Sequence, residues 1–443
     1  MKPMNFILSM AMLACVSCGS DGNDTPNPPV GPVTPTEGPQ APTEVIYQAN
    51  PRFFATNNCL DAITAQIGNI SDMGCDILWV MPVQQPGEKK AVGSPYCIRD
   101  YKSVNTKYGT MTDFRELVNA AHAKGMKVIL DWVANHTSWD NAWITEHPEY
   151  YAKDNNGNIV QASTWSDVAQ LDYSNANLRK EMIDAMVYWV NETGIDGFRC
   201  DYTNGVPHDF WSSAIKTLRG INPDIIMLAE TSFADFYNDG FDMIYDWDFA
   251  PAMTKTFAGG KVSDLYDKEA ASWKQVPEDK DILRYAFNHD YAAENAIDKS
   301  YGSADGVYAA YVLTAMLHGT PMIYSSMDAD NVSGKLSFFN YNPLTWSASK
   351  RAVYKKINDA FKASAKARGG ELTTYNNDDV AVFTRTSAQQ TALVMVNTTG
   401  SSQTVKTPIT YAGVQMTEQI SGTQVAMPTA VTLEPYGYRI YLK

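Results

Sequence analysis

Basic residues and cysteines are both scarce in this sequence, and each shortage excludes a class of protein. The chain has 35 Lys and Arg against 49 Asp and Glu, which gives a formal net charge of −14. Without a basic face to displace counterions, a nucleic-acid partner is excluded. No CxxC pair occurs among the four cysteines beyond the leader, which argues against a zinc site. We expect Cys59, Cys75, Cys97 and Cys200 to be buried free thiols.

The N-terminal hydrophobic run is too short to be a membrane span. It covers residues 6–16 after the positive charge of Lys2, whereas a helix that crosses a bilayer needs about 20 residues. The small residues before Cys18 resemble a bacterial lipoprotein signal. We therefore expect residues 1–18 to be a signal segment and Cys18 to become the lipidated N-terminus. Cys15 is a rival acceptor, and an ordinary cleaved signal is the alternative.

Residues 19–43 are rich in Pro, Thr and Gly, and they predict a disordered tether because such a segment cannot bury a core. The acidic residues that follow Cys18 resemble surface-export signals of some Gram-negative gut bacteria. A lipid and a tether together indicate a protein of the cell envelope, anchored to the outer membrane and exposed at the surface.

The 443 residues are enough for one large domain and one small one. Strand-like runs alternate with amphipathic stretches such as residues 111–124 and 177–193, a pattern that predicts an α/β protein built on a (β/α)₈ barrel. Eight runs are the predicted barrel strands: residues 45–48, 76–83, 127–132, 197–201, 224–230, 241–246, 282–288 and 321–325.

Two further regions interrupt or follow the predicted barrel. The barrel is expected over residues 44–136 and 177–368, with a short excursion domain at 137–176 that is rich in Trp, Asn and Asp. Residues 369–443 contain short β-type runs broken by Asn, Gly and Pro, which predict a C-terminal all-β sandwich. No Trp lies after Trp346, so that sandwich lacks the commonest ring for stacking on a sugar.

Catalytic groups of a barrel lie where its strands end, at the C-terminal face. Three carboxylates, one arginine and two histidines follow or end the predicted strands: Asp201, Glu230, Asp290, Arg199, His136 and His289. A retaining glycosidase needs two carboxyl groups roughly 5–5.5 Å apart, one as nucleophile and one as acid.

The neighbours of two carboxylates suggest how the roles divide. Arg199 precedes Asp201 by two residues on the same strand face, which favours an ionised nucleophile. Glu230 follows an apolar run, and burial there would raise its pKa and keep it protonated, as a general acid requires. Asp290 and the two histidines can bind sugar hydroxyls.

The sequence from about Val45 to the C-terminus resembles the α-amylase family of glycoside hydrolases (family 13). The resemblance is carried by Asp131…Asn135-His136, Gly197-Phe-Arg-Cys-Asp201, Glu230 and Phe287-Asn-His-Asp290, with further similarity at Leu78-Trp-Val-Met-Pro-Val83, Tyr108-Gly-Thr and Gly319-Thr-Pro-Met-Ile-Tyr324.

This resemblance implies retaining cleavage of α-1,4-glucosidic bonds in starch-type glucans, without a cofactor for the chemistry. By position it implies Asp201 as nucleophile, Glu230 as acid/base and Asp290 as third carboxylate. Sugar-binding roles are implied for Arg199, His136, His289, Tyr96 and Asp100. With the lipid signal, the chain is similar to lipid-anchored surface amylases of starch-using Gram-negative bacteria.

The sequence departs from the family at a calcium-associated position and beside the cleavage point. The family often has a lysine and a histidine where this chain has Asn204 and Gly205, and an aspartate where it has Gln170. Asn135 remains as a ligand for a structural calcium ion, but a hard cation prefers several charged oxygens, so we expect a weakened site. The same departure leaves the subsites beyond the cleavage point open.

Alternative activities share the same chemistry. They are an exo-acting α-glucosidase, a cyclodextrin- or pullulan-cleaving enzyme and a transglycosylase, and the short excursion slightly favours access by a polymer. From a different class, a non-catalytic glucan-binding protein should have lost a catalytic carboxylate, and all three are present. We expect a monomer whose partners are an α-glucan and, through the lipid, a membrane.

Overall fold

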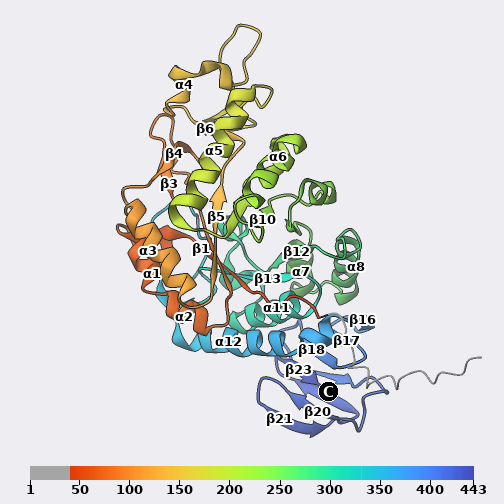
Figure 1. The fold of residues 1–443 in the computed structure, drawn as a ribbon. Coiled ribbons are helices and arrows are strands. Elements are labelled where there is room, and N and C mark those ends of the chain that lie inside the picture. Colours follow the sequence, from red (N-terminus) through yellow and green to blue (C-terminus); the bar gives the residue numbers. More distant parts are fainter. Residues whose placement is uncertain (1–39, 331) are drawn as a thin grey trace, which may run out of the picture. The chain divides into compact units, whose positions relative to one another are not determined.

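A computed structural model describes residues 40–330 and 332–443 (Figure 1). The predicted signal segment with Cys18, and residues 19–39 of the predicted tether, lie outside this part of the chain. Eight parallel strands close into a barrel in the order β1-β13-β12-β11-β10-β9-β5-β2. Their bounds are β1 (Ile46–Ala49), β2 (Ile77–Val80), β5 (Lys127–Trp132), β9 (Gly197–Cys200), β10 (Ile226–Ala229), β11 (Met243–Tyr245), β12 (Asp281–Tyr285) and β13 (Thr320–Tyr324). The prediction of a (β/α)₈ barrel is confirmed.

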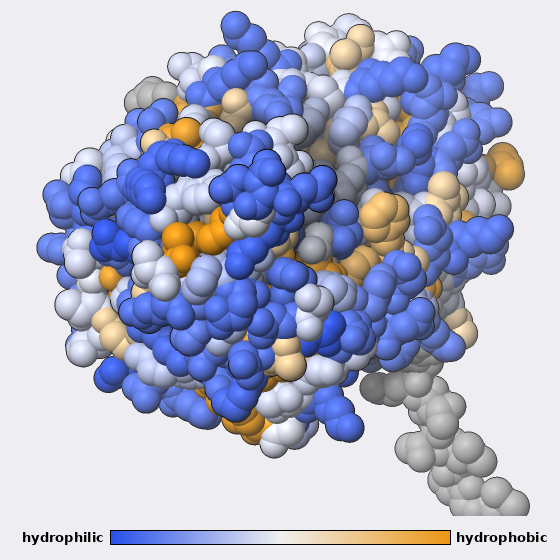
Figure 2. Space-filling model, turned by 90° about the horizontal axis from the view of Figure 1, so that it is seen from above, coloured by the Kyte–Doolittle hydropathy of each residue, from blue (hydrophilic) through white to orange (hydrophobic). Residues whose placement is uncertain are grey.

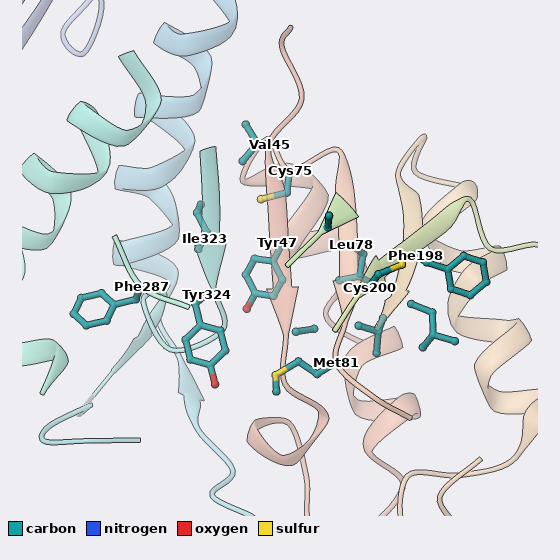
Figure 3. Packing of buried hydrophobic residues seen from close by; sticks show 14 of the residues in the cluster. Val45, Tyr47, Cys75, Leu78, Met81, Phe198, Cys200, Phe287, Ile323 and Tyr324 are labelled. Atoms are coloured by element: carbon teal, nitrogen blue, oxygen red, sulfur yellow. The ribbon is translucent and has the colours of Figure 1, made fainter. Parts of the chain in front are cut away.

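The barrel strands are apolar on both faces because the barrel interior and the layer under the helices are both dry. Ile46, Trp79 and Leu228 belong to the cluster inside the barrel. Neighbouring residues such as Tyr47 and Leu78 point outward and join the larger cluster beneath the helices (Figure 3). All four cysteines predicted to be free thiols are buried and unpaired.

Helices surround the barrel, and their ends follow the local sequence. Thr110 and Asp113 form a reciprocal capping box at the start of α3, while α5 begins at the Asn175 cap and ends at Gly194 with φ of 71°. The helices are α1 (Cys59–Thr64), α2 (Ile67–Asp72), α3 (Met111–His122), α5 (Ala176–Thr193), α6 (His208–Arg219), α7 (Phe249–Phe257), α8 (Val262–Trp273), α9 (His289–Glu294), α10 (Ile297–Ser300), α11 (Ala304–Met316), α12 (Ala348–Ala363) and α13 (Ala365–Arg368). Among the described residues, no helix combines the length and the apolar character needed to cross a bilayer.

The excursion between β5 and α5 is a small antiparallel sheet with strand order β6-β8-β7. Its elements are β6 (His136–Ser138), α4 (Trp143–Glu146), η2 (Pro148–Tyr150), β7 (Gln161–Ala162) and β8 (Trp165–Gln170). The hairpin of β3 (Gln84–Pro86) and β4 (Ile98–Val104) lies against it. Tyr101 joins the two, because its hydroxyl donates to the carbonyls of Val133 at 2.8 Å and His136 at 2.9 Å. The excursion is thereby held against the end of the barrel.

The C-terminal region is an antiparallel β-structure of two unequal sheets, which confirms the predicted all-β domain. The larger sheet has the order β16 (Glu371–Tyr375), β17 (Val380–Thr386), β18 (Thr391–Asn397), β23 (Tyr438–Leu442), β20 (Gln415–Glu418) and β21 (Thr423–Ala426), and the smaller one pairs β19 (Gln403–Lys406) with β22 (Ala430–Leu433). Val380 and Val382 face the smaller sheet, whereas Ala381 and Phe383 join the main core beside α11 and α13. A further short pair, β14 (Ala329–Asp330) with β15 (Thr345–Trp346), follows β13.

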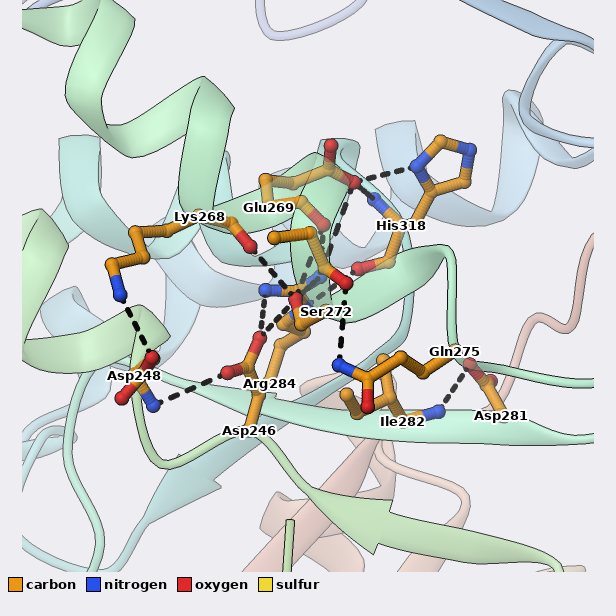
Figure 4. A network of polar contacts seen from close by, with 11 residues as sticks. Asp246, Asp248, Lys268, Glu269, Ser272, Gln275, Asp281, Ile282, Arg284 and His318 are labelled. Carbon is orange, nitrogen blue, oxygen red and sulfur yellow. Dashed lines mark hydrogen bonds and ion pairs between the residues drawn. The ribbon is translucent and has the colours of Figure 1, made fainter. Parts of the chain in front are cut away.

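A buried polar network lies between the barrel wall and α8 (Figure 4). Arg284 of β12 forms an ion pair with Asp246, while its second terminal nitrogen lies 3.9 Å from Glu269. His318 Nδ1 lies 2.6 Å from the same Glu269 oxygen, and Ser272 donates to Asp246 at 2.8 Å. Although burial favours the neutral acid, the bonds from His318 and the charge of Arg284 lower the pKa of Glu269. Each carboxylate in this network thus has close polar partners.

Candidate active site

A cleft of about 410 Å³ opens at the C-terminal ends of the barrel strands, beneath the excursion. The view from above shows a hollow near the centre of this face, with hydrophobic residues beside it (Figure 2). The cleft is lined by six of the predicted site residues: Tyr96, His136, Asp201, Glu230, His289 and Asp290. The barrel therefore brings together side chains that are up to 194 positions apart in the sequence (Tyr96 to Asp290).

Arg199 lies at the floor of this cleft, with no exposed side-chain surface. It pairs in register with Asp131 of the neighbouring strand, so both side chains point into the barrel. Its Nη1 donates to Asp131 Oδ1 and to Asp201 Oδ1, each at 2.9 Å. Its Nη2 lies 2.8 Å from Glu230 Oε1, but that contact lacks the alignment of a hydrogen bond. One guanidinium thus contacts three carboxylates, and it binds Asp131 and Asp201 better than Glu230.

A chain of hydrogen bonds connects Gln48 of β1 to Asp131 of β5 and fixes two predicted sugar-binding residues, His289 and Tyr96. The Gln48 amide nitrogen faces His289 Nδ1 at 2.8 Å, so Nδ1 accepts and the ring proton sits on Nε2. His289 Nε2 lies 2.8 Å from the Tyr96 hydroxyl, which in turn donates to Asp131 Oδ2 at 3.0 Å. The Tyr96 and His289 rings are also stacked, with centroids 5.4 Å apart. Burial and the charge of Arg199 lower the pKa of His289 well below its usual value, so this imidazole is neutral.

Backbone hydrogen bonds set the positions of Asp201 and Glu230. The Asp201 N–H donates to the Trp132 carbonyl at 2.9 Å, and the Glu230 N–H donates to the Cys200 carbonyl at 3.0 Å, which extends the barrel ladder by one residue on each strand. Tyr202 then turns into the left-handed region with φ of 40° and ψ of 52°. That turn aims its N–H at Glu230 Oε2, 2.6 Å away. A backbone conformation that costs about 1–3 kcal/mol is thus retained where it orients a carboxylate.

Four carboxyl groups in the cleft titrate well above their ordinary range. Burial, partly offset by Arg199, raises the pKa of Asp131 to about 6 and that of Asp201 to about 7. Burial raises the pKa of Glu230 to about 7, with contributions from the Asp201 charge and from a hydrogen bond to Asp201. Desolvation and the Glu230 charge raise the pKa of Asp290 to about 7. One arginine cannot neutralise four neighbouring carboxylates, so protons remain bound near neutral pH.

The other predicted site residues are placed differently. His136 lines the cleft as a buried neutral ring, because burial lowers its pKa to about 4. Asp290 is partly exposed at the rim and lies 3.3 Å from His289 Nε2. Asp100 is not among the cleft-lining residues. It is exposed on β4, and its carboxylate accepts the N–H of Lys102 at 2.9 Å.

The residues around Asn135 do not fit the calcium ion that the resemblance implied. Three oxygens converge there, the carbonyl and side-chain oxygens of Asn135 and the carbonyl of Leu171. The Gln170 amide nitrogen donates to all three, at 3.0, 3.1 and 3.1 Å. Because only a donor is stable among three acceptors, the nitrogen and not the oxygen of this amide faces them. An N–H group thus occupies the point where a cation would bind, and the group supplies no carboxylate.

The structure adds four aromatic residues that the sequence patterns did not single out: Trp165, Tyr202, Phe338 and Phe339. Trp165 of β8 and Tyr202 line the cleft beside Glu230, and Phe338 lines it beside Tyr96 and His289. Arg52 holds the backbone near Phe338, because its Nη1 donates to the carbonyls of Phe338 at 3.3 Å and Phe339 at 2.7 Å. The Trp content of the excursion was the one sequence feature that could have indicated Trp165. No periodicity connects this residue to the barrel site.

The closed parallel barrel and the carboxylates around a buried arginine define a class of protein, the barrel glycoside hydrolases. Comparison with known proteins identifies the family. Residues 51–158 and 158–367 match the family described as "Alpha amylase, catalytic domain", and residues 371–440 match "Maltogenic Amylase, C-terminal domain". The chain belongs to the α-amylase family of glycoside hydrolases.

Relatives within the family carry several names. An α-amylase, MalA, from Haloarcula japonica is 26% identical over 407 residues, which are 86% of this chain and 59% of that protein. An α-amylase structure from Lactobacillus plantarum has a TM-score of 0.80 and 26% identity, covering 90% of this chain and 99% of that one. A noncanonic maltogenic α-amylase, AmyB, from Thermotoga neapolitana has a TM-score of 0.79 and 25% identity, covering 90% and 98%. Other relatives are named cyclomaltodextrin glucanotransferase, cyclomaltodextrinase and neopullulanase.

Proposed function

We propose that this protein hydrolyses α-1,4-glucosidic bonds in starch-type glucans with retention of configuration. Asp201 is the nucleophile, Glu230 the general acid/base and Asp290 a carboxylate that binds hydroxyls of the reacting sugar. The observation that carries the proposal is the buried Arg199, which holds Asp201 and Glu230 on its two terminal nitrogens. Because both carboxyls contact the same guanidinium, they lie close together, as a retaining enzyme needs.

The contacts of Arg199 support the division of roles. An aligned hydrogen bond to Asp201 favours its ionised form, whereas the misaligned contact with Glu230 favours ionisation less. The pKa of each acid is raised to about 7, and because the aligned bond from Arg199 favours the ionised form of Asp201, we infer that the shared proton lies on Glu230. Near neutral pH the pair therefore holds one proton, on the residue that must donate it.

The reaction then follows in two balanced displacements. An oxygen of Asp201 bonds to the anomeric carbon while the glycosidic C–O bond breaks, and the Glu230 proton passes to the departing oxygen. Glu230, now ionised, takes a proton from water, whose oxygen bonds to the anomeric carbon and releases Asp201. Tyr96, His289 and Asp290 lie where they can hold the sugar ring, since all three line the cleft at its floor or rim. The neutral His289 lines the site without adding a positive charge.

The names of the relatives support a glucan substrate and leave several activities to separate. An amylase shortens amylose, whereas a cyclodextrinase, a pullulan-cleaving enzyme or a transglycosylase gives a different product pattern. The decisive experiment is chromatography of the products that the wild-type protein forms from amylose, pullulan and a cyclodextrin, with Asp201→Asn as the matched control. We expect oligosaccharides chiefly from amylose. Cleavage of cyclodextrin or pullulan alone would move the assignment to those activities, and no cleavage of any substrate would favour a glucan-binding protein.

We also propose that a lipid on Cys18 anchors the enzyme to the outer membrane at the cell envelope, with residues 19–43 as the tether. The support is the sequence alone, a short hydrophobic run with small residues before Cys18. Cys18→Ala with Cys15 intact should move the protein from the membrane fraction to the soluble fraction. Cys15→Ala is the control and should stay membrane-bound, and the opposite pattern would assign the lipid to Cys15.

A further inference from the structure

Trp165 is a large aromatic residue that remains exposed in the cleft. It begins β8 of the excursion, and 38% of its surface is accessible. An indole buries a large apolar area, so an exposed one that lines a cleft is a candidate binding surface. Its ring stands edge-on to Tyr202, with centroids 5.0 Å apart, and contacts His136 at 5.5 Å. The excursion thereby places an indole directly above the barrel site.

Tyr202 places its ring next to Trp165 through an unusual local structure. It follows Asp201 in the left-handed conformation, in which its N–H bonds Glu230. The ring then lies over Gly205, where an added Cβ would come within 2.4 Å of it and within 2.5 Å of Asn135 Oδ1. Any side chain at position 205 would displace the ring. The glycine that departs from the family pattern is therefore what allows Tyr202 to lie here.

The position of the proposed general acid, Glu230, indicates where the leaving part of the substrate lies. In the proposed reaction Glu230 protonates the departing oxygen, so the leaving part of the substrate lies on the Glu230 side. Tyr202 is bonded to Glu230, and Trp165 contacts Tyr202. A second aromatic group in the cleft consists of Tyr96, which is stacked on His289, and Phe338, which contacts both rings. Of these two aromatic groups, Trp165 and Tyr202 form the one that is joined to Glu230.

We propose that Trp165 and Tyr202 form the subsite that binds the glucosyl unit on the leaving-group side of the cleaved bond. This inference rests on the proposed function. The two aromatic residues take the place of the lysine and histidine that the family often has where this chain has Asn204 and Gly205. The apolar face of a pyranose ring stacks on the exposed indole, and Tyr202 supports that indole from the side. The subsite acts on the transition state only when the leaving group is a sugar.

The test compares two substrates with different leaving groups. In maltopentaose a sugar departs, whereas α-maltosyl fluoride releases fluoride and leaves the proposed subsite empty. For Trp165→Ala we expect kcat/KM for maltopentaose to fall roughly 10- to 100-fold, as for the loss of an aromatic stacking partner. The value for the fluoride should fall less than about threefold, because that substrate does not use the subsite. Trp165→Phe, which keeps a ring, should recover most of the loss.

Trp273→Ala is the matched control. This half-buried Trp lines a separate cavity beside Lys127, Ile226 and Asp281, where barrel strands begin, and its removal should not alter the ratio of the two rates. An equal loss on both substrates, or no loss on either, would overturn the subsite. If the wild-type protein hydrolyses neither substrate, the proposed function fails instead, so the two failures are distinguishable.

A second inference rests on a separate observation, the Gln170 amide among three oxygens. We infer that this amide replaces a metal ion at the joint between the barrel and the excursion. Gln170 ends β8, and its nitrogen bonds two oxygens of Asn135, which follows β5, and the carbonyl of Leu171. Hydrogen bonds therefore hold the joint, and a metal chelator such as EDTA should not weaken them.

Thermal unfolding tests this inference without an activity assay. The Tm of the wild-type protein should be the same in EDTA and in calcium chloride. Gln170→Glu places a carboxylate among the three oxygens, so its Tm should fall in EDTA and recover in calcium. Gln161→Glu, on exposed β7 of the same sheet, is the control and should not respond to calcium. A wild-type Tm that EDTA lowers and calcium restores, or a Gln170→Glu variant without a calcium response, would overturn the inference.

Discussion

Two fully buried arginines occupy the barrel of this protein, and their surroundings differ in one decisive way. Arg199 faces the cleft and contacts three carboxylates, with a fourth nearby at the rim. Arg284 lies under α8 and contacts two carboxylates, one of which is also bonded by His318. Three carboxylates share Arg199, whereas at the Arg284 centre the second carboxylate, Glu269, also has His318 as a close partner.

The glutamates of the two centres show the consequence. Glu230 and Glu269 are both desolvated, which favours the neutral acid. Beside Arg199, burial together with the Asp201 charge raises the pKa of Glu230 to about 7, so Glu230 can carry a proton at neutral pH. Beside Arg284, the bonds from His318 outweigh burial and lower the pKa of Glu269. Buried carboxyls that share one arginine thus give a proton donor, whereas a buried carboxyl that also has its own hydrogen-bond donors stays ionised.

The largest expected effect separates the two centres by activity. Asp201→Asn removes the nucleophile and should lower kcat on amylose by several orders of magnitude. The Tm should not fall, because Arg199 keeps Asp131 and Glu230 as partners. Asp246→Asn at the other centre is the control, and below its unfolding temperature it should retain most of the wild-type kcat. Comparable rates for the two variants would contradict the distinction.

At the Arg284 centre we expect a substitution to lower stability and to leave kcat nearly unchanged. Arg284→Lys cannot reach both carboxylates and leaves buried charge unpaired, so the free energy of unfolding should fall by about 3 kcal/mol. Urea unfolding at neutral pH measures this change, and the kcat of the folded variant is measured beside it. Unchanged stability would show that the Arg284 network contributes little, and a lost kcat would connect it to the site.

The pH dependence sharpens the account of the cleft. With α-maltosyl fluoride, kcat/KM should rise with pH as Asp201 ionises, with a midpoint well above the ordinary Asp pKa because burial raises the pKa of Asp201 to about 7. With maltopentaose, an alkaline limb should be added, since Glu230 must remain protonated to donate to a sugar leaving group. Glu230→Gln should slow maltopentaose far more than the fluoride. An acid limb near pH 4 would contradict the raised pKa.

The smallest expected effect is on thermal stability. A carboxyl whose pKa is raised on folding stabilises the protein fully below its unfolded pKa, and this stability is lost as pH rises through the folded value, here about 7 for Glu230. Glu230→Gln stays neutral, so its Tm should match the wild type near pH 4 and exceed it by about 2–4 °C near pH 8. A lower Tm at pH 8 would mean that the ionised Glu230 is stabilised by the fold.

Much of this arrangement could be predicted from the sequence. Apolar runs of strand length give the barrel, and the rule that catalytic groups follow barrel strands leads to Asp201, Glu230 and Asp290. The prediction that Arg199 would decide the charge of Asp201 was incomplete, because burial of four carboxyls in one cleft is a tertiary effect. The domain bounds and the roles of the site residues stay predictions.

Other features depend on contacts that no local pattern encodes. Strands β16, β19 and β21 were not predicted because they are short, polar and largely exposed. Trp165 reaches the cleft only through the pairing of β8 with β6, and Tyr202 only through a left-handed turn. Gln170 was noticed as a departure, but its bonds to three oxygens require the barrel and the excursion to meet. Asp100 does not line the cleft, because it lies at an exposed position of β4.

The central claim is that Asp201 forms a covalent bond to the sugar. A ring-fluorinated α-maltosyl fluoride tests it directly, because the ring fluorine slows release of the glycosyl enzyme while fluoride still departs. Mass spectrometry of the intact protein should show one added maltosyl unit, and digestion should place it on the peptide that contains Asp201. A label on another carboxylate, or products of inverted configuration with no label, would contradict the account.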